Sequence, residues 1–429
     1  MLGIIAFLGL LASFWPSLIS FWKIVVALGA LVLLIDVILS NRSQPIEVER
    51  DLPGSLPLGV SRHVGLRIHN RSNRKHSLEV YDHFPVDVQS EGLPVKLILS
   101  AEQHADIQYA IIAHKRGTLN FPLVQIKLES LFGFWQRNIN LPISNNTNVY
   151  PNFAAISHYA LLATDNNLSQ MGIIKKRRRG EGQDFHQLRE YREGDALRQI
   201  DWKATSRIQK LISREYQDER DQEIIFMLDC GHRMLAKDDH LSHFDHTLNA
   251  LLLLSYVALK QGDAVGLCTF ASSAREDQRW IAPRKGQHTV QTILNTVYDL
   301  QPSTESPDYS KAATDLLIRH KKRALVIILT NTRDEDAEDL LPAIQLLKKR
   351  HLVLLASLRE TSIDQTLEQP IEDLQSAIDN AATHQYLQHR KKAFEKITSS
   401  GVTTMDVQPD KMTVELINAY LGIKRSGAL

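Results

Sequence analysis

Residues 223–229 read EIIFMLD, an apolar run between two acids, and the pattern around this run decides the fold class. Apolar runs of similar length return at 264–270, 324–330 and 352–358, with segments between them that are long enough for helices. Strands that alternate with helices are typical of a parallel sheet, and nearly continuous apolar runs indicate burial on both faces. We therefore predict an α/β doubly wound domain over residues 223–429, with a ligand crevice beyond the carboxyl ends of its strands.

The segment before this domain, residues 180–216, mixes charges of both signs with large aromatic side chains. It reads GEGQDFHQLREYREGDALRQIDWKATSRIQKLISREY. Solvated charge runs carry one sign or have low complexity, and they lack large aromatics. Because arginine can grip a carboxylate at two points, this composition indicates partly buried ion pairs. We assign residues 152–222 to a linker followed by this charged segment.

Five consecutive cations, Lys175-Lys-Arg-Arg-Arg179, stand within that linker. Anionic lipid head groups attract each cation near a membrane surface by about 1 kcal/mol. An acidic partner protein is a second candidate for this run. A solvated loop with nearby acids as counter-charges is the plain alternative.

The first forty residues are far more apolar than the rest of the chain. Residues 2–15 contain no charge, and residues 24–39 contain only Asp36. A spanning helix needs about 20 apolar residues, so each run reaches the minimum only with residues from the turn between them. We predict a transmembrane helical hairpin over residues 1–40. A signal peptide fits poorly, because no basic residue precedes the first run and a second run follows it.

Residues 45–151 form a different pattern, short strands separated by polar turns. Alternating or apolar runs occur at 63–69, 78–81, 95–99, 107–113, 121–128 and 134–141. Short strands at regular spacing are typical of an antiparallel sandwich. We therefore predict a β-sandwich-like domain, and we find no catalytic motif in it.

Charge and cysteine content exclude some classes of protein. Fifty basic and 49 acidic residues give a net charge of +1, so no global field draws the chain to nucleic acid. The two cysteines, Cys230 and Cys268, both fall on or beside predicted strands. We therefore predict that both cysteines are buried, reduced thiols and not a disulfide bridge. Reduced thiols are typical of cytosolic proteins.

The charged segment also carries a resemblance to the family known as domain of unknown function 58. The matching residues are Gly180, Gly182, Phe185, Leu188-Arg-Glu-Tyr191, Gly194-Asp195, Arg198, Ile200-Asp-Trp202, Lys203-Ala204 and Arg207. The predicted hairpin and β-rich domain resemble the family's longer members. The resemblance implies a bacterial inner-membrane protein with cytoplasmic soluble domains, a C-terminal domain similar to von Willebrand factor type A, and genes often beside MoxR-type AAA+ ATPases. It implies no established activity.

Two interpretations of the charged segment stay open. In the first, four arginines pair with Asp195, Asp201 and Glu190, while Phe185 and Trp202 fill a gap beside the sheet. In the second, the segment is a docking surface for an ATPase or a client protein, because Arg, Tyr and Trp dominate binding hot spots. The candidate partner-binding residues are Phe185, Arg189, Tyr191, Arg192, Gly194, Asp195, Arg198, Asp201, Trp202, Lys203 and Arg207.

A magnesium site is the second candidate, and it depends on the residues after the first strand. Type A domains often hold Mg²⁺ through Asp-x-Ser-x-Ser, because this hard cation prefers carboxylate and hydroxyl oxygens. Here the sequence reads Asp229-Cys-Gly-His-Arg233, so glycine and arginine replace both hydroxyls. A hydroxyl from Thr304, Ser303 or Ser306 and the carboxylate of Asp334, from later loops, complete only a partial set with Asp229.

We therefore expect no cofactor, with Mg²⁺ as the alternative, and we expect Arg233 or His232 to neutralise Asp229 directly. The run His240-Leu-Ser-His243-Phe-Asp-His246 offers two histidines on one helical face, a weak signal for Zn²⁺ or Ni²⁺. The chain contains no nucleophile elbow, Walker A loop or dinucleotide-binding glycine motif.

These observations together favour a membrane-anchored, non-enzymatic adaptor. The resemblance implies a MoxR-type ATPase as its partner, and the predicted hairpin implies contact with membrane lipid. The client protein is unknown, and nucleic acid is not expected as a partner. A metal-assisted enzyme using the Asp229 crevice and a structural subunit of an envelope complex are the alternatives.

Overall fold

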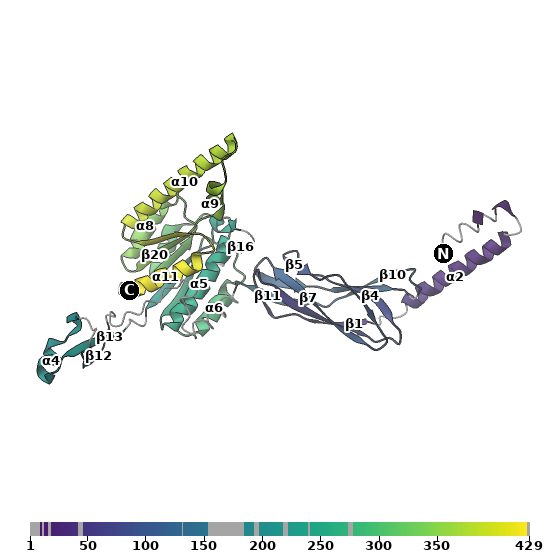
Figure 1. The fold of residues 1–429 in the computed structure, drawn as a ribbon, viewed down its shortest axis with the longest axis horizontal. Helices are drawn as coiled ribbons and strands as arrows, with labels where there is room; N and C mark the ends of the chain where they lie inside the picture. Colours follow the sequence, from purple (N-terminus) through teal and green to yellow (C-terminus); the bar gives the residue numbers. More distant parts are fainter. Residues whose placement is uncertain are drawn as a thin grey trace. The chain divides into compact units, whose positions relative to one another are not determined.

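The structure is a computed structural model of the 429-residue chain (Figure 1). It describes all residues except 1–8, 11–12, 16–18, 42–45, 131, 153–183, 193–196, 218–221, 239–240, 273–277 and 427–429. The run of five cations at 175–179 therefore lies outside the described residues. The chain divides into two compact units, Met1–Leu56 with Val60–Val149, and Pro57–Gly59 with Tyr150–Leu429.

One long apolar helix, α2 (Ile19–Asn41), begins the well-described part of the first unit. Its stretch Ile19–Ile38, with a mean hydropathy of 2.4, is the one segment of the described residues long and apolar enough to cross a membrane. Most of the first predicted span, residues 2–15, lies outside the described residues. The predicted hairpin is therefore not supported, and a single candidate span replaces it.

The rest of the first unit consists of antiparallel sheets. One sheet has the order β1-β3-β7-β5 and another the order β10-β9-β4-β6. Buried and less buried residues alternate along β3 and β4, as the period of a strand requires. The bounds are β1 (Ile46–Asp51), β2 (Ser55–Pro57), β3 (Arg62–Asn70), β4 (His76–Asp82), β5 (Val88–Glu91), β6 (Val95–Leu99), β7 (His104–Ala113), β8 (Gly117–Phe121), β9 (Val124–Glu129), β10 (Gln136–Leu141) and β11 (Asn145–Tyr150).

One predicted strand, 121–128, is wrong in its extent. The structure ends β8 at Phe121 and starts β9 at Val124, with Pro122 in the connection. Proline has no N–H to donate to a sheet ladder, so it interrupts a run whose apolar pattern otherwise continues.

A six-stranded sheet, β18-β17-β14-β19-β20-β21, is the centre of the second unit. Its five strands β17, β14, β19, β20 and β21 pair in parallel, as the alternating pattern predicts. The edge strand β18 pairs antiparallel with β17, which the sequence pattern did not indicate. The bounds are β14 (Glu223–Asp229), β17 (Ala264–Phe270), β18 (Trp280–Arg284), β19 (Leu325–Thr330), β20 (Leu352–Leu358) and β21 (Thr403–Val407).

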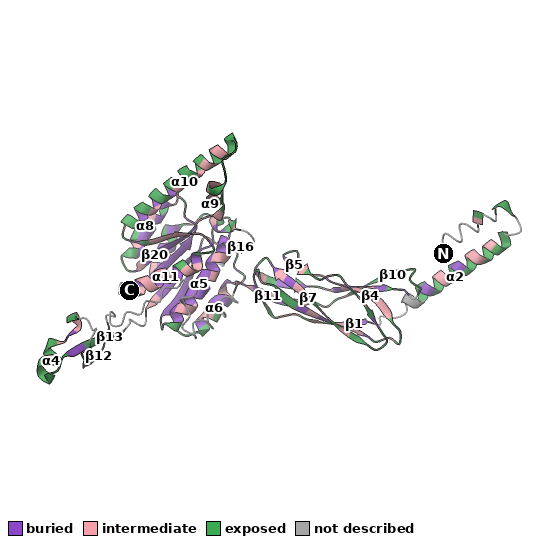
Figure 2. Cartoon of the chain, in the orientation of Figure 1, coloured by how far each residue is buried: buried purple, intermediate pink, exposed green. Residues whose placement is uncertain are grey.

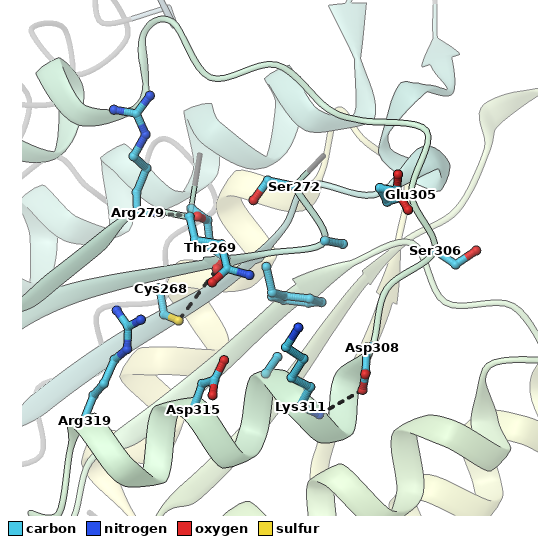
Figure 3. A pocket seen from close by; sticks show the side chains of 14 residues that line it. Cys268, Thr269, Ser272, Arg279, Glu305, Ser306, Asp308, Lys311, Asp315 and Arg319 are labelled. Carbon is cyan, nitrogen blue, oxygen red and sulfur yellow. Dashed lines mark hydrogen bonds between the residues drawn. The ribbon is translucent and has the colours of Figure 1, made fainter. Parts of the chain in front are cut away.

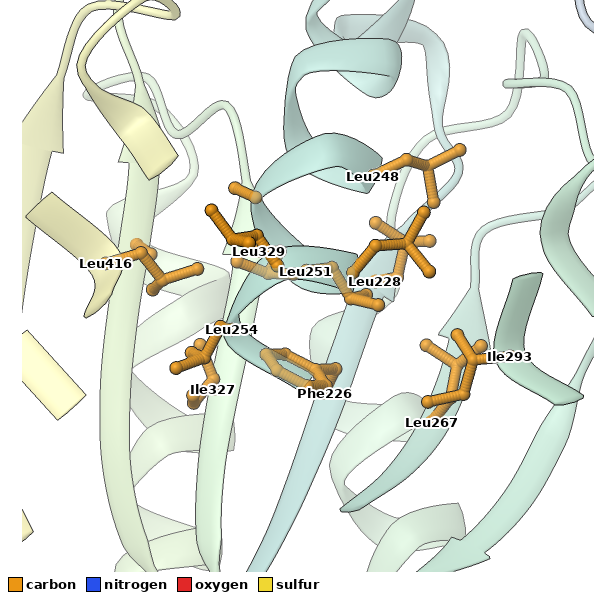
Figure 4. Packing of buried hydrophobic residues seen from close by; sticks show 14 of the residues in the cluster. Phe226, Leu228, Leu248, Leu251, Leu254, Leu267, Ile293, Ile327, Leu329 and Leu416 are labelled. Carbon is orange, nitrogen blue, oxygen red and sulfur yellow. The ribbon is translucent and has the colours of Figure 1, made fainter. Parts of the chain in front are cut away.

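Helices cover both faces of this sheet. Phe226 and Leu228 point into a core with α5, α6 and α11 (Figure 4), whereas Ile225 and Met227 point into the opposite core with α7, α8 and α10. Two buried faces explain why β14 has no polar alternation. The bounds are α5 (His243–Lys260), α6 (His288–Val297), α7 (Tyr309–Arg319), α8 (Ala337–Lys348), α9 (Thr361–Glu368), α10 (Leu374–Ser399) and α11 (Met412–Arg425).

Two smaller features complete this domain. A 3-10 turn, η4 (His232–Leu235), follows β14, and the short strands β15 (Lys237–Asp238) and β16 (Leu241–Ser242) precede α5. Cys230 and Cys268 are both free and buried, which confirms the prediction of reduced thiols.

Candidate functional site

The charged segment folds as a small module of its own elements. Strand β12 (Asp184–Glu190) pairs antiparallel with β13 (Ile212–Gln217), and η3 (Leu197–Gln199) and α4 (Trp202–Ile208) lie between them in the chain (Figure 1). We call residues 184–217 the signature module. Among those of its residues whose burial is described, the buried apolar ones are Ile200, Ala204 and Ile212.

Asp201 organises the helix of the signature module. Its Oδ1 accepts a hydrogen bond from Ala204 N at 3.0 Å and caps α4, and its Oδ2 accepts from Arg214 Nε at 2.9 Å. Two hydrogen bonds lower the pKa of Asp201, and the bond from the Ala204 backbone has a larger effect than the bond from Arg214. Glu190 pairs with Lys210 at 2.6 Å. Arg214 and Lys210 were not among the predicted partners of these acids.

Large apolar side chains on the signature module are exposed to solvent. They are 43–72% exposed and comprise Leu188, Leu197, Trp202, Ile208 and Leu211. Figure 2 shows α4 mostly in the colour of exposed residues. The interpretation in which Trp202 fills a gap is therefore not supported, because its side chain is 68% exposed and only Ala204 of α4 is buried.

The remaining predicted partner-binding residues occupy varied positions. Lys203 and Arg207 are exposed on α4, and Arg192, just after β12, is exposed as well. Arg189 and Tyr191 are half-buried. The backbone of Phe185 lies in β12 and that of Arg198 in η3, while Gly194 and Asp195 lie outside the described residues.

The carboxyl ends of β14 and β19 lie where the strand order reverses direction, which is where the sequence predicts a crevice. Asp229, fully buried at the end of β14, accepts hydrogen bonds from Thr330 Oγ1 at 2.7 Å and from Gly231 N at 2.8 Å. Tyr309 Oη lies 3.1 Å from Thr330 Oγ1. Burial raises the pKa of Asp229 to about 6, although the two hydrogen bonds oppose this rise.

Arg233, four residues after Asp229 in the chain, pairs with other acids. Arg233 Nη1 lies 2.8 Å from Asp336 Oδ2, and Arg233 Nη2 lies 3.4 Å from Glu335 Oε2. His232 Nδ1 lies 3.2 Å from the Glu305 carbonyl. The expected direct pairing of Arg233 or His232 with Asp229 is therefore not supported, since a hydroxyl and a backbone N–H hold this carboxyl group, and His232 acts on its pKa only through charge.

Among the described residues, no hydrogen bond joins Thr304 or Asp334 to Asp229, although the loop that carries Thr304 contacts Cys230 and His232 through its backbone. Thr304 is exposed, and the buried hydroxyl of that loop belongs to Ser303, which donates to the Ala271 carbonyl at 2.6 Å. Asp334 lies 3.5 Å from His389. Asp336 is instead the acid whose charge acts on Asp229, and sequence reasoning missed it.

The histidine run before α5 does not form the weak metal site considered above. His243 is fully buried, its Nε2 lies 2.5 Å from Asp238 Oδ2, and its Nδ1 lies 3.2 Å from Asn331 Nδ2. Both ring nitrogens are therefore engaged within the protein. His240 lies outside the described residues, and the part of the chain that is described contains no cluster of three or more metal-ligating side chains.

A buried arginine, Arg390 of α10, joins three parallel strands. Only 1% exposed, it forms a two-point ion pair with Asp406 of β21 at 2.7 and 3.0 Å. It also donates to Ser357 Oγ at 3.1 Å, to the Leu358 carbonyl at 2.7 Å and to the Thr332 carbonyl. No sequence motif pointed to this residue.

A pocket of about 270 Å³ opens beside β17 and α7 (Figure 3). Charges of both signs line it, including Arg279, Glu305, Lys311 and Arg319. Its one thiol, Cys268, has a pKa raised to about 11 by burial, so it is protonated at neutral pH. No histidine is among its described lining residues.

The observed parts define a class of protein, a candidate membrane-associated chain with antiparallel β-sheets, a charged module and an α/β domain. The model of the family described as "Protein of unknown function DUF58" matches residues 187–397 of this chain. This range contains most of the signature module and much of the α/β domain. A comparison with curated proteins found no match.

Solved structures show only remote likeness. A mutated aerotolerance-related membrane protein from Bacteroides fragilis is 14% identical, with 47% of this chain and 98% of that chain covered and a TM-score of 0.29. A Salmonella alpha-2-macroglobulin mutant is 13% identical over 25% of this chain, with a TM-score of 0.20, and this chain spans only 7% of its length. A FixG-related protein from Vibrio parahaemolyticus is 12% identical over 25% of this chain and 98% of that chain, with a TM-score of 0.18. At these TM-scores the likenesses carry no argument about function.

Proposed function

We propose that this protein is a non-enzymatic, membrane-anchored adaptor whose signature module docks a MoxR-type AAA+ ATPase. The ATPase supplies energy for the assembly or maturation of a protein complex, and the adaptor holds it at the bacterial inner membrane. In this proposal the soluble domains are cytoplasmic, the β-sheets act as spacer or client contact, and the α/β domain binds proteins. The apolar helix Ile19–Ile38 supports the anchoring.

The observation that carries the docking role is the 68% exposure of Trp202 on the signature module. A tryptophan held in water gains nothing for the fold, whereas tryptophan is among the residues that contribute most at protein interfaces. Exposed arginine and lysine side chains at 192, 203 and 207 accompany it on the same module. Such a mixture fits a surface with an apolar anchor and a charged rim.

Replacing Trp202 with alanine is expected to abolish retention of the ATPase without unfolding the module. Hot-spot truncations cost at least about 2 kcal/mol, so the dissociation constant rises at least about 30-fold. The cap between Asp201 and Ala204 does not involve the indole, so α4 stays formed. Co-purification from detergent extracts, with and without ATP, measures the loss.

The matched control is Ile98→Ala, which removes a large apolar side chain of the β-domain that is 60% exposed. It should retain the ATPase as well as the native chain does. Equal retention by Trp202→Ala would refute docking through this module. If the native chain fails to co-purify with the ATPase both with and without ATP, the alternative of a structural subunit in an envelope complex is favoured.

The enzyme alternative requires Mg²⁺ in the Asp229 crevice, and we expect none to bind. Both carboxyl oxygens of Asp229 already accept hydrogen bonds, from Gly231 N and from Thr330 Oγ1. Titration calorimetry of the purified chain with Mg²⁺ should give only the heat of dilution. A binding isotherm that disappears in Asp229→Ala would overturn the non-enzymatic assignment.

A further inference from the structure

The turn between β9 and β10 presents a small group of aromatic side chains to solvent. Phe132 is 52% exposed, Phe134 41% and Trp135 47%. The centroids of the two phenyl rings lie 6.4 Å apart. Ser130 N donates to the Trp135 carbonyl at 2.9 Å, which joins the two ends of the turn, and Gly133 adopts φ +73. We call Phe132, Phe134 and Trp135 the aromatic tip.

The aromatic tip is attached to the apolar helix through Asp36. Its carboxylate is fully buried and accepts from Ser130 Oγ at 2.7 Å and from Phe132 N at 3.2 Å. Asp36 is the one charged residue between positions 24 and 39. A carboxylate is costly within hydrocarbon, so a helix that carries one near its end needs polar partners at that depth. The turn supplies these partners.

Distances along the helix place Asp36 at a membrane boundary. Ile19 and Asp36 are separated by about 26 Å at 1.5 Å per residue, close to the roughly 30 Å thickness of a hydrocarbon core. Phe21, which is 55% exposed, lies near the other end of this span. Aromatic residues gather at both membrane–water interfaces, and α2 itself has none near Asp36.

We propose that the aromatic tip inserts into the lipid head-group region beside the carboxyl end of α2. It supplies the second interfacial belt of the span from a segment almost a hundred residues further along the chain. The lipid bilayer is its occupant, because the tip adjoins the end of a helix whose exposed side chains are themselves apolar, Leu31, Leu34, Val37 and Ile38. This inference rests on the membrane anchoring proposed above.

Depth-dependent quenching of an environment-sensitive probe tests this insertion in the full chain. Phe134→Cys carries the probe, and Val86→Cys is the matched control. Val86 is fully exposed and follows the end of β4, whose pairing with β9 places it away from the aromatic tip. The native thiols are buried, and the raised pKa of Cys268 suppresses its labelling. The labelled chains are reconstituted in vesicles of phosphatidylcholine and phosphatidylglycerol.

Nitroxide lipids labelled near the glycerol level should quench the probe at position 134 at least about threefold more than that at 86, with aqueous iodide showing the reverse order. Asp36→Leu removes the two acceptor contacts and should lower the lipid quenching at 134. Equal iodide quenching at both positions, or protection of 134 from both quenchers by covering protein, would overturn the inference. Persistent lipid quenching in Asp36→Leu would overturn the attachment through Asp36.

Vesicle flotation separates this inference from the proposed anchoring. A chain that fails to float with the vesicles lacks the membrane anchor altogether. A chain that floats has retained its anchor. If the probes at positions 134 and 86 are then quenched equally, only the insertion of the aromatic tip is refuted.

Discussion

Replacing Arg390 with methionine is expected to lower the free energy of unfolding of the α/β domain by about 3 kcal/mol. Removal of one partner of a buried ion pair costs about 3–5 kcal/mol, and the lower end applies because Asp406 is 23% exposed. The carbonyls of Leu358 and Thr332 also lose their donor. Urea unfolding measures the change in the free energy of unfolding. Hydrogen exchange detects it in the peptides that contain β19, β20 and β21.

Lys391→Met on the same helix is the matched control, because this lysine is exposed and a surface substitution changes stability by less than about 0.5 kcal/mol. Arg390→Lys should fall between the two, since an ammonium group lacks the planar fork that reaches both oxygens of Asp406. If Arg390→Met is as stable as Lys391→Met, the strand-joining role of the arginine is refuted.

Replacing Asp229 with asparagine should stabilise the folded chain at neutral pH. The pKa of this buried carboxyl group rises from 3.8 to about 6 on folding, which corresponds to about 3 kcal/mol. Asparagine keeps the acceptor for Gly231 N and provides a donor for Thr330 Oγ1, so the local hydrogen bonds survive. We expect a gain of about 2–3 kcal/mol at pH 7.

The pH dependence of this gain has a definite sign. A raised pKa means that the folded state binds the proton more tightly than the unfolded state does. The native chain therefore loses stability as pH rises from about 4 to about 6, and it does not regain this stability above pH 6. Asp229→Asn removes this loss, so the two chains should be equally stable near pH 4 and differ most above pH 6.

Urea midpoints between pH 4 and pH 8 measure this difference. Asp334→Asn, a partly exposed carboxyl group, is the control and should shift the midpoint little. Destabilisation by Asp229→Asn at pH 7 would mean that the ionised carboxylate is stabilised by a nearby cation, which favours the metal-assisted alternative.

Hydrophobic periodicity alone located most elements of the chain. The apolar runs at 264–270 and 352–358 correspond to β17 and β20 residue for residue, because a strand buried on both faces admits no polar interruption. The alternation in β3 and β4 likewise follows from one buried face. Two free, buried cysteines were also predictable, since both stand on or next to such runs.

Which polar groups meet depends on tertiary structure. Arg390 and Asp406, Arg233 and Asp336, and Asp36 and Ser130 are each brought together by packing between elements, and no local spacing encodes these pairs. Exposure of Trp202 has the same origin, because a tryptophan within a mixed-charge segment suits a filled gap and a bare surface equally well. Periodicity records which side of an element is buried, whereas partner choice arises from the three-dimensional arrangement of the elements.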